Sequence, residues 1–316
     1  MNDLMKHKFI NKKIRSDVYD DNGILFSKIT NLKTCEVADF YTVSPFPNYE
    51  GFENKLDLSK TLINNSFLKD FKQTIGYGKS FLEVGSGTSQ LSIAMATGTN
   101  NLIVALDPTL ASLKLGNTFA QKNNVKNIKF FKADIFENPI TSNYFDYVWC
   151  SGVLHHTNNP QQAFKIIAHW VKPGGLIIIG LYNKYGRLRT NFRQFLYNFF
   201  RKSKLAKSII FLFDPHLRKN LSHEKKTAWF RDQYEHPIES KHTIDEVISW
   251  FDKNNISFRG SLPSPDLETT KNLSEMDGIK MSWFSRIIAQ ISMLFNNQGS
   301  EGGLFLVIGK KNKNIK

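Results

Sequence analysis

The sequence predicts a doubly wound α/β fold with a mostly parallel sheet, and three observations indicate it. Short apolar runs alternate with segments of helical pattern from residue 79 to residue 182. The runs are nearly continuous in apolar residues, as expected for parallel strands that helices cover on both faces. A Gly-x-Gly turn directly follows the first run, where the backbone must turn sharply and permit a close approach.

Five runs in this region are predicted to be strands. They span residues 79–85, 101–107, 128–134, 145–151 and 175–182. Helices are expected between them, with starts near Thr88, Pro108 and Asn159. The third start has the strongest signals, because Asn159 is a preferred N-cap residue, Pro160 suits the first helical position and Gln162 completes the capping pattern.

The flanking regions add further elements. A helix is expected near 57–74, after an aromatic and turn-rich stretch at 40–52. Thr243 and Glu246 have the spacing of a capping box, which places the start of another helix there. The C-terminal part then supplies two strand candidates and one helical segment, at 256–263, 302–311 and 281–295 respectively.

These patterns divide the chain into four parts. Residues 1–78 are expected to form an N-terminal lid, and residues 79–182 form the core. The segment 183–242 is too long for an ordinary connection, so it is predicted to be an inserted cap over the substrate. Residues 243–311 complete the core sheet and carry a helical insertion at 264–301.

Composition limits the class of protein. With 41% hydrophobic and 22% charged residues, the chain is globular and long enough to bury one large core. The net charge of +14 permits nucleic acid, an anionic membrane surface or an acidic substrate as partner, and it selects none of them. Cys35 and Cys150 are too few for a disulfide framework or a thiolate zinc site.

The location of the protein is expected to be cytoplasmic. The N-terminal residues are basic but are not followed by an apolar segment with a small-residue cleavage site, so no secretory signal is evident. No apolar stretch approaches the ~20 residues that are needed to span a bilayer.

The first strand carries the strongest functional signal. Glu83 lies inside the apolar run, and the chain then breaks at Gly85-Ser86-Gly87. A dinucleotide fingerprint would need a third glycine where Gln90 stands, and the charge of Glu83 would repel a pyrophosphate. An acidic side chain beside a glycine turn instead favours a small cationic ligand at the end of the strand.

This motif resembles the first motif of class I S-adenosylmethionine (SAM)-dependent methyltransferases, an acidic residue followed by x-Gly-x-Gly. Here Glu83, Gly85 and Gly87 occupy it, and Ser89 replaces the last glycine of the family motif. The stretch "FDYVWCSGVLHHTNNP" and the later "KPGG" turn resemble the branch that includes the ubiquinone and menaquinone C-methyltransferases. The resemblance implies a Rossmann-like sheet of seven strands, with only the 302–311 strand antiparallel, and makes residues 79–182 the SAM-binding core.

Two more acids end successive strands. Asp107 lies 22 residues after Gly85, near the spacing of a ribose-binding carboxylate, although Asp107-Pro108 also suits the start of a helix. Asp134 ends the third strand, where a turn or cap aspartate is the alternative. The resemblance implies that Asp107 binds the ribose and Asp134 the adenine. The full set of predicted cofactor-binding residues is Glu83, Gly85, Ser86, Gly87, Asp107, Pro108, Asp134, Ile135 and Cys150.

Residues after the fourth and fifth strands are the candidates for catalysis and acceptor binding. His155 is the candidate base; the alternative is that one histidine of the pair packs against the next helix while the other faces solvent. Tyr182, Asn183 and His156 are the candidate substrate contacts. No metal site is expected, because adjacent histidines point apart in an extended chain and the spacing of His236, Glu239 and His242 does not by itself bring them together.

The segment 189–213 could define a partner. Phe192, Phe195, Leu196, Phe199 and Phe200 follow helical spacing, and no acidic residue occurs from 183 through 213. Such a basic amphipathic helix suits an anionic membrane surface, with the protein peripheral to it. Alternatively the stripe covers the protein's own cavity, and RNA binding is a weaker third reading. No obligate protein partner is implied.

The predicted function is methyl transfer from SAM to a small-molecule or lipid-like acceptor. Carbon, oxygen and nitrogen acceptors all agree with the residues named above. The alternative belongs to a different class: a non-catalytic protein on a methyltransferase scaffold that associates with RNA or a membrane.

Overall fold

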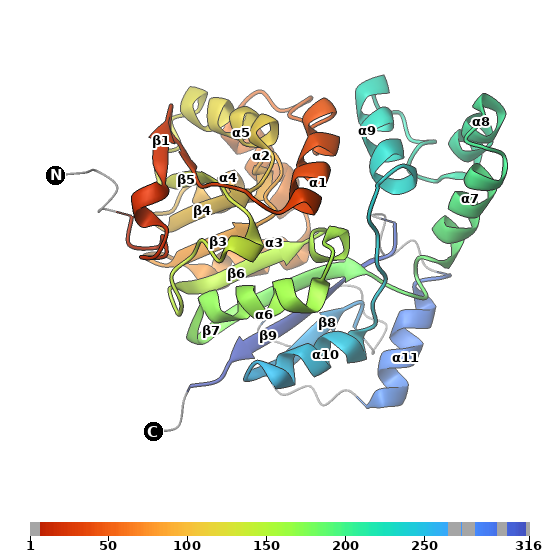
Figure 1. Ribbon diagram of the computed structural model, residues 1–316. Helices are drawn as coiled ribbons and strands as arrows, with labels where there is room; N and C mark the ends of the chain where they lie inside the picture. Colours follow the sequence, from red (N-terminus) through yellow and green to blue (C-terminus); the bar gives the residue numbers. More distant parts are fainter. Residues whose placement is uncertain (1–6, 265–272, 274–281, 296–301, 314–316) are drawn as a thin grey trace.

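A single twisted sheet runs through the molecule in the computed structural model, which describes residues 7–264, 273, 282–295 and 302–313 (Figure 1). Within these residues the sheet has nine strands in the order β1-β2-β5-β4-β3-β6-β7-β9-β8. The strands are β1 Tyr19–Asp21, β2 Ile24–Phe26, β3 Ser80–Val84, β4 Leu102–Asp107, β5 Ile128–Lys132, β6 Phe145–Ser151, β7 Val171–Tyr182, β8 Ile256–Leu262 and β9 Leu304–Lys311.

All seven predicted strands are confirmed, and the sheet is mostly parallel. β9 lies between β7 and β8 and is antiparallel to both, as expected. It is not the single antiparallel strand that was predicted, because β1 also pairs antiparallel with β2. The predicted number of seven was wrong, because the N-terminal segment adds β1 and β2 at the other edge. Ile24, Leu25 and Phe26 are buried and pair with β5, but three residues are too few to show a strand pattern in the sequence.

The helices also agree with the predicted starts. The α-helices are α1 Leu32–Val43, α2 Lys55–Ile63, α3 Ser66–Ile75, α4 Gln90–Ala96, α5 Leu110–Lys122, α6 Pro160–Trp170, α7 Leu188–Phe199, α8 Lys204–Phe213, α9 His223–Tyr234, α10 Ile244–Lys253 and α11 Trp283–Ser292. The helix expected near 57–74 is two helices, α2 and α3, because Asn65 caps a new start. Much of the predicted helical insertion at 264–301 lies outside the described residues.

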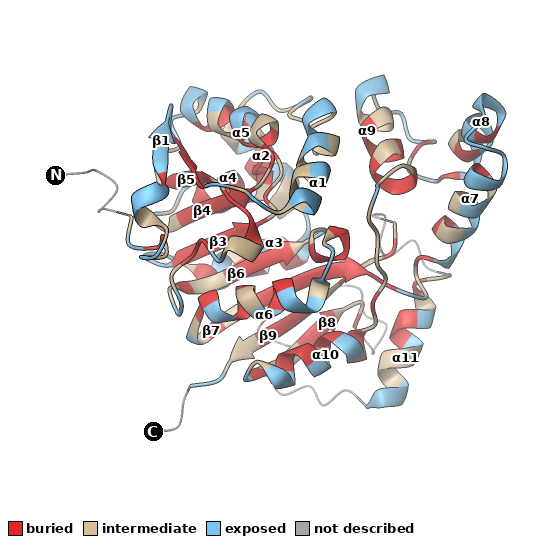
Figure 2. Ribbon diagram, in the orientation of Figure 1, coloured by how far each residue is buried: buried red, intermediate tan, exposed pale blue. Residues whose placement is uncertain are grey.

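Two layers of helices cover the sheet. Phe71 of α3, Ile93 of α4 and Leu113 of α5 pack on one face, while Phe164 of α6 and Phe251 of α10 pack on the other. The central strands are buried on both faces (Figure 2), which explains their continuous apolar sequence. The parallel strands all run in the same direction, so their carboxyl ends lie at the same edge of the sheet, where ligands bind in sheets of this kind.

The insert 183–242 forms a small helical unit beside this edge. α7, α8 and α9 pack around their own apolar cluster, which includes Tyr197, Ile210, Trp229 and Phe230. The outer faces of α7 and α8 are exposed (Figure 2). Within the part of the chain that the structure describes, no helix is both long and apolar enough to cross a membrane.

Removing the Phe251 ring should destabilise the core strongly. Phe251 is fully buried and stacks on Phe164 with ring centroids 5.6 Å apart. Phe251→Ala should therefore lower the free energy of unfolding by about 3–5 kcal/mol. Urea denaturation measures this, with Leu56→Ala at an exposed position as the control. Equal effects of the two substitutions would contradict this packing.

Candidate functional site

Three carboxylates meet at the carboxyl edge of the sheet. Glu83 lies in β3, Asp107 ends β4 and Asp134 follows β5, and these three strands are neighbours. All three side chains are buried, and they line a cavity of about 530 Å³. This volume is in the range of small-molecule sites.

The glycine turn after β3 is closely packed. Gly85 and Gly87 have φ of +66° and +52°, in the left-handed region that glycine tolerates best. A Cβ on Gly85 would lie 2.2 Å from the Val153 side chain, and one on Gly87 would lie 2.5 Å from the Phe46 carbonyl oxygen. Both positions therefore need glycine for space as well as for conformation.

Ser89 marks the departure from the family motif. It has φ +66°, so a serine holds a conformation in which the family has a glycine. Its hydroxyl lies 3.1 Å from that of Ser86, and both side chains are buried. This contact ties the two ends of the turn together.

Hydrogen bonds hold the carboxylates in place. The Ser92 backbone N–H donates to Glu83 Oε2 at 2.9 Å, and the Ser92 hydroxyl donates to the same oxygen. Asp107 accepts from the Gly87 N–H at 2.8 Å and from the Thr109 N–H at 2.7 Å. The N-cap residue of α5 is Thr109, so Asp107 does not begin the helix as the alternative reading of Asp107-Pro108 had it. Its bond to Thr109 instead supports the turn before α5, while the carboxylate also faces the cavity.

Burial makes these acids difficult to ionise without a cation nearby. It raises the pKa of Glu83 to about 8 and that of Asp107 to about 6, against the hydrogen bonds that lower both. The pKa of Asp134 is also raised by burial. A cationic ligand in the cavity would reverse this effect, because it favours the charged form of each acid.

The N-terminal segment covers this end of the cavity. The Thr34 hydroxyl of α1 donates to Asp134 at 2.9 Å. The Tyr49 hydroxyl donates to the Thr88 carbonyl oxygen at 2.6 Å. Both bonds connect residues far apart in the sequence. The first brings the segment onto the chain that follows β5, and the second brings it onto the turn that follows β3.

A second polar group lies at the other end of the cavity. Asp232 of α9 accepts from the Tyr41 hydroxyl at 2.6 Å, from the Tyr182 hydroxyl at 3.2 Å and from Gln233 Nε2 at 2.7 Å. Burial and the nearby Asp232 raise the pKa of both tyrosines, so the phenols stay protonated and donate. Apolar side chains complete this end of the cavity wall: Phe46, Trp229 and Leu304.

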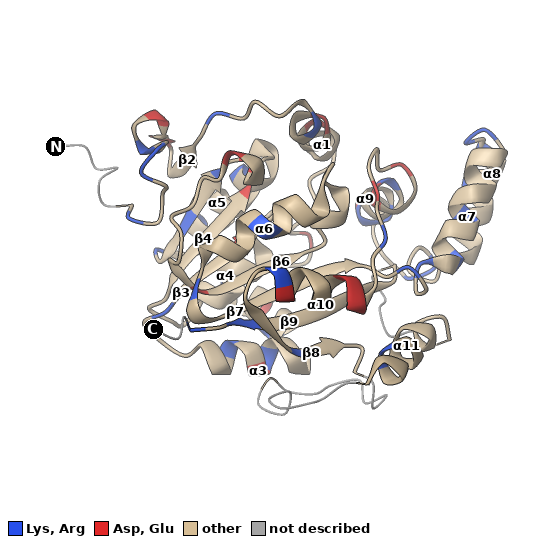
Figure 3. Ribbon diagram, turned by 60° about the horizontal axis from the view of Figure 1, so that its bottom comes forward, with Lys and Arg blue, Asp and Glu red and all other residues tan. Residues whose placement is uncertain are grey.

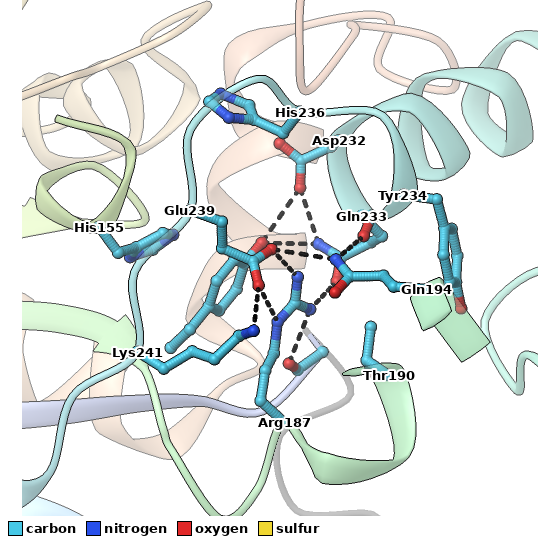
Figure 4. A network of polar contacts seen from close by, with 12 residues as sticks. His155, Arg187, Thr190, Gln194, Asp232, Gln233, Tyr234, His236, Glu239 and Lys241 are labelled. Carbon is cyan, nitrogen blue, oxygen red and sulfur yellow. Dashed lines mark hydrogen bonds and ion pairs between the residues drawn. The ribbon is translucent and has the colours of Figure 1, made fainter. Parts of the chain in front are cut away.

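Arg187 supports this group from behind (Figure 4). Its guanidinium is fully buried, lies over the Tyr182 ring at 3.7 Å and pairs with Glu239. It also donates to Gln233 and to the Gly302 carbonyl oxygen. One side chain therefore joins the start of α7, the end of α9 and the chain before β9.

The two adjacent histidines have different environments. His155 is fully buried behind the cavity wall, 3.9 Å from the Tyr182 ring between centroids, and neither ring nitrogen has a hydrogen-bond partner among the described residues. His156 lines the cavity, stacks on His236 and has Nδ1 2.7 Å from the Ile238 carbonyl oxygen. Burial lowers the pKa of both, so both rings are neutral near pH 7.

The structure brings most of the predicted site residues to one cavity. The following predicted residues line it: Glu83, Gly85, Ser86, Gly87, Asp107, Pro108, Asp134, Ile135, His156 and Tyr182. The predicted residues Cys150, His155 and Asn183 do not line the cavity. Cys150 is buried inside the sheet, and Asn183 donates to Gln290 at 2.9 Å.

Sequence reasoning missed several residues of the cavity. Tyr41, Asp232 and Gln233 carried no recognised motif, and their contacts join positions up to 191 residues apart. Arg187 was also missed. Its only signal was a basic residue at the expected start of the insert.

The three residues considered as possible metal ligands do not point toward a common position. His236, Glu239 and His242 have different partners, namely His156, Arg187 and Glu246 respectively. Within the described residues no group of three or more His, Cys, Asp or Glu side chains has the geometry to hold a metal ion.

The doubly wound sheet and the acid-lined cavity at its carboxyl edge define a domain that binds a small ligand. Comparison with known families identifies its class. The model of a family described as "Methyltransferase domain" matches residues 75–241, more than half of the chain. The chain therefore belongs to this family, and the matched region is a methyltransferase domain of the class I SAM-dependent type.

Individual relatives are more distant. The chain is 30% identical over 137 residues to "Ubiquinone biosynthesis O-methyltransferase" of Coxiella burnetii, covering 43% of this chain and 55% of that protein. It is 27% identical over 145 residues to the "Ubiquinone/menaquinone biosynthesis C-methyltransferase" of the same organism, covering 43% and 58%. The chain thus spans little more than half the length of these curated relatives.

Solved structures support the fold alone. Geranyl diphosphate C-methyltransferase from Streptomyces coelicolor has a TM-score of 0.50 at 10% identity, covering 90% of this chain and 100% of that one. PKMT2 from Rickettsia typhi has a TM-score of 0.54 at 14% identity, covering 78% and 53%.

The cavity residues fit SAM, the cofactor of this class. Glu83, Asp107 and Asp134 face the cavity, and among the described residues no Lys or Arg forms an ion pair with any of them. A ligand with an ammonium and a sulfonium compensates such acids, whereas a phosphate would be repelled. Glu83 would hold the ammonium, Asp107 the ribose hydroxyls and Asp134 the adenine.

SAM should bind more tightly as the pH rises from about 6 to about 8. A cation beside Glu83 requires the ionised carboxylate, whose pKa in the free protein is about 8, so binding below this pH must release a proton. Affinity should rise by up to about tenfold per pH unit. Calorimetry over this range, in buffers of different ionisation enthalpy, measures both the affinity and the released proton.

Glu83→Gln is the matched control for that experiment. The variant should bind SAM more weakly and lack this pH dependence, since the amide does not ionise. Asp107, with a pKa of about 6, contributes only at the lower end of the range. An unchanged slope in the variant would assign the proton to another group.

Loss of the Arg187 guanidinium should destabilise the insert. Among the residues that the structure describes, Arg187→Met leaves the nearly buried Glu239 with Lys241, at 3.4 Å, as its one ionic partner. We expect the free energy of unfolding to fall by about 3–5 kcal/mol. Urea denaturation measures it, with the exposed Arg189→Met as control. A double variant with Glu239→Gln should lose less than the sum of the two single changes; strict additivity would argue against the pair.

Proposed function

We propose that this protein transfers a methyl group from SAM to a small, lipid-like acceptor that carries a hydroxyl group. Two of the relatives described above are named as enzymes of quinone biosynthesis, and one of these as an O-methyltransferase. The cavity beyond the carboxylates combines apolar side chains with a few fixed polar groups. That combination suits an acceptor with an apolar body and a single polar reacting end.

We further propose that His156 is the general base. The carbonyl oxygen of Ile238 can only accept, so the contact at 2.7 Å fixes the proton on His156 Nδ1. The neutral ring then has its lone pair on Nε2, which is free to accept a proton from the acceptor. This is the single observation that carries the proposed mechanism, and it favours His156 over His155, which does not line the cavity.

The chain's own residues then have distinct tasks. SAM, when bound, supplies an electrophilic methyl group on its sulfonium. As the acceptor oxygen forms its bond to the methyl carbon and the carbon–sulfur bond breaks, His156 Nε2 takes the hydroxyl proton. Tyr41 and Tyr182, held by Asp232, orient the acceptor, and the covering segments exclude water.

Replacing His156 should reduce turnover without reducing cofactor binding. We expect His156→Gln to lower kcat by about 100- to 10,000-fold, because a positioned base contributes about that much. The assay is formation of S-adenosylhomocysteine with a panel of phenols and catechols, with and without isoprenoid tails. His169→Gln, at an exposed position, is the control.

Two outcomes would overturn these proposals separately. Full activity of His156→Gln on a turned-over acceptor would remove the base assignment but keep the enzyme. Failure of the intact protein to bind SAM in calorimetry would reject the proposed reaction altogether.

A further inference from the structure

The insert has an exposed apolar face that the proposed reaction does not use. Phe192, Phe195 and Phe199 of α7 are 62%, 60% and 68% exposed, and Leu205 and Leu212 of α8 are 70% and 65% exposed. The α7 residues are three and four positions apart, and in α8 the partly exposed Ile209 lies between Leu205 and Leu212 at the same spacing. Each helix therefore presents one outward stripe. Isolated exposed apolar residues are ordinary, but a continuous patch of large ones marks a surface for interaction.

This face is not part of the cavity or of a core. None of the stripe residues lines the cavity. The opposite sides of the same helices carry Tyr197, Ala206 and Ile210, which are buried against α9. The helices therefore already have their intramolecular packing, and the stripe is left outside it.

The rim of this face is basic. No acidic residue occurs between 183 and 213, and Figure 3 shows basic but no acidic segments on α7 and α8. The exposed basic residues on this side are Lys184, Arg189, Arg201, Lys202 and Lys204. Lys207 is not counted with them, because its ammonium lies over the buried Phe230 ring. Arg201 and Lys202, at the turn that joins the helices, have positive φ of 51° and 55°. That tight turn keeps the two stripes together and places both charges at its tip.

We propose that the α7–α8 face docks on an anionic lipid surface. Large apolar side chains with Lys and Arg beside them are the pattern of helices that lie in the plane of a membrane interface. Each basic residue near an anionic surface adds to the attraction, and the segment 183–213 itself carries no acid to oppose it. A second protein would need acids opposite these bases, whereas anionic headgroups supply that charge without a matched shape.

The position of the face relative to other elements agrees with this. α11 lies on the same side of the molecule in both views (Figures 1 and 3), and it also exposes large apolar residues, including Trp283 and Phe284. The helical unit that carries the face also supplies Trp229 and Asp232 to the cavity. In a protein docked in this way, the helical unit of α7, α8 and α9 would contact the lipid surface with one side and line the cavity with the other.

Vesicle flotation of the full chain tests the proposal, independently of methyl transfer. We expect at least about tenfold more protein on vesicles of phosphatidylcholine mixed with phosphatidylglycerol than on phosphatidylcholine alone, and a loss of this difference at high salt. Two sets of substitutions should each reduce binding by about tenfold or more. The sets are Phe192→Gln with Phe195→Gln and Phe199→Gln, and Arg201→Gln with Lys202→Gln and Lys204→Gln.

The matched control removes three exposed apolar residues elsewhere, in Leu56→Gln, Tyr77→Gln and Leu115→Gln, and should bind as the wild type does. Calorimetry with SAM verifies that each variant has kept its fold and cofactor site. The proposal would be overturned if binding were equal on charged and uncharged vesicles, or if neither set of substitutions reduced it. Self-association of the protein would also overturn it, if analytical ultracentrifugation shows that the phenylalanine substitutions abolish this association. A second copy of the chain would then cover the face.

Discussion

The site depends on the burial of ionisable oxygens at the ends of β3 and β4. A carboxylate out of water is costly unless donors surround it. Ser92 supplies two donors to Glu83, and the Gly87 backbone supplies one to Asp107. The turn between the strand and α4 must therefore follow the path that presents these donors, and this path is the reason for the left-handed glycines. The same acids, once held, make the cavity selective for a positively charged ligand.

Two segments from outside the core complete that cavity, and they contact each other. Tyr41 of α1 bonds to Asp232 of α9, and the Arg231 guanidinium lies over the Phe40 ring at 4.8 Å. Lys225 of α9 also donates to the Glu50 carbonyl oxygen. The N-terminal segment and the insert thus form one cover, although the core separates them in the sequence. The buried Arg187 fastens the insert's side of this cover to β7 and to the chain before β9.

The sequence was sufficient for the core and for the acid-lined end of the cavity, because both depend on local patterns. Continuous apolar runs indicated the strands, and each acid stood at the end of one. Other features depend on distant contacts. β1 and β2 have three residues each, so no period was visible. The sequence made His155 the candidate base and His156 a substrate contact, but Leu154–His156 form a 3-10 turn rather than the extended chain that was assumed. Both rings are buried there, and of the two only His156 lines the cavity. The apolar stripe was visible, but not the direction in which it points.

The bond between Thr34 and Asp134 has a consequence for how molecules enter and leave. Asp134 stands at the rim of the cavity, and α1 uses it as an anchor. Any molecule that passes beneath α1 must break this bond, and its departure allows the bond to form again. On that route, opening of the cover and exchange of the contents would be one event, and the rate of release would depend on the N-terminal helix as well as on the chemistry.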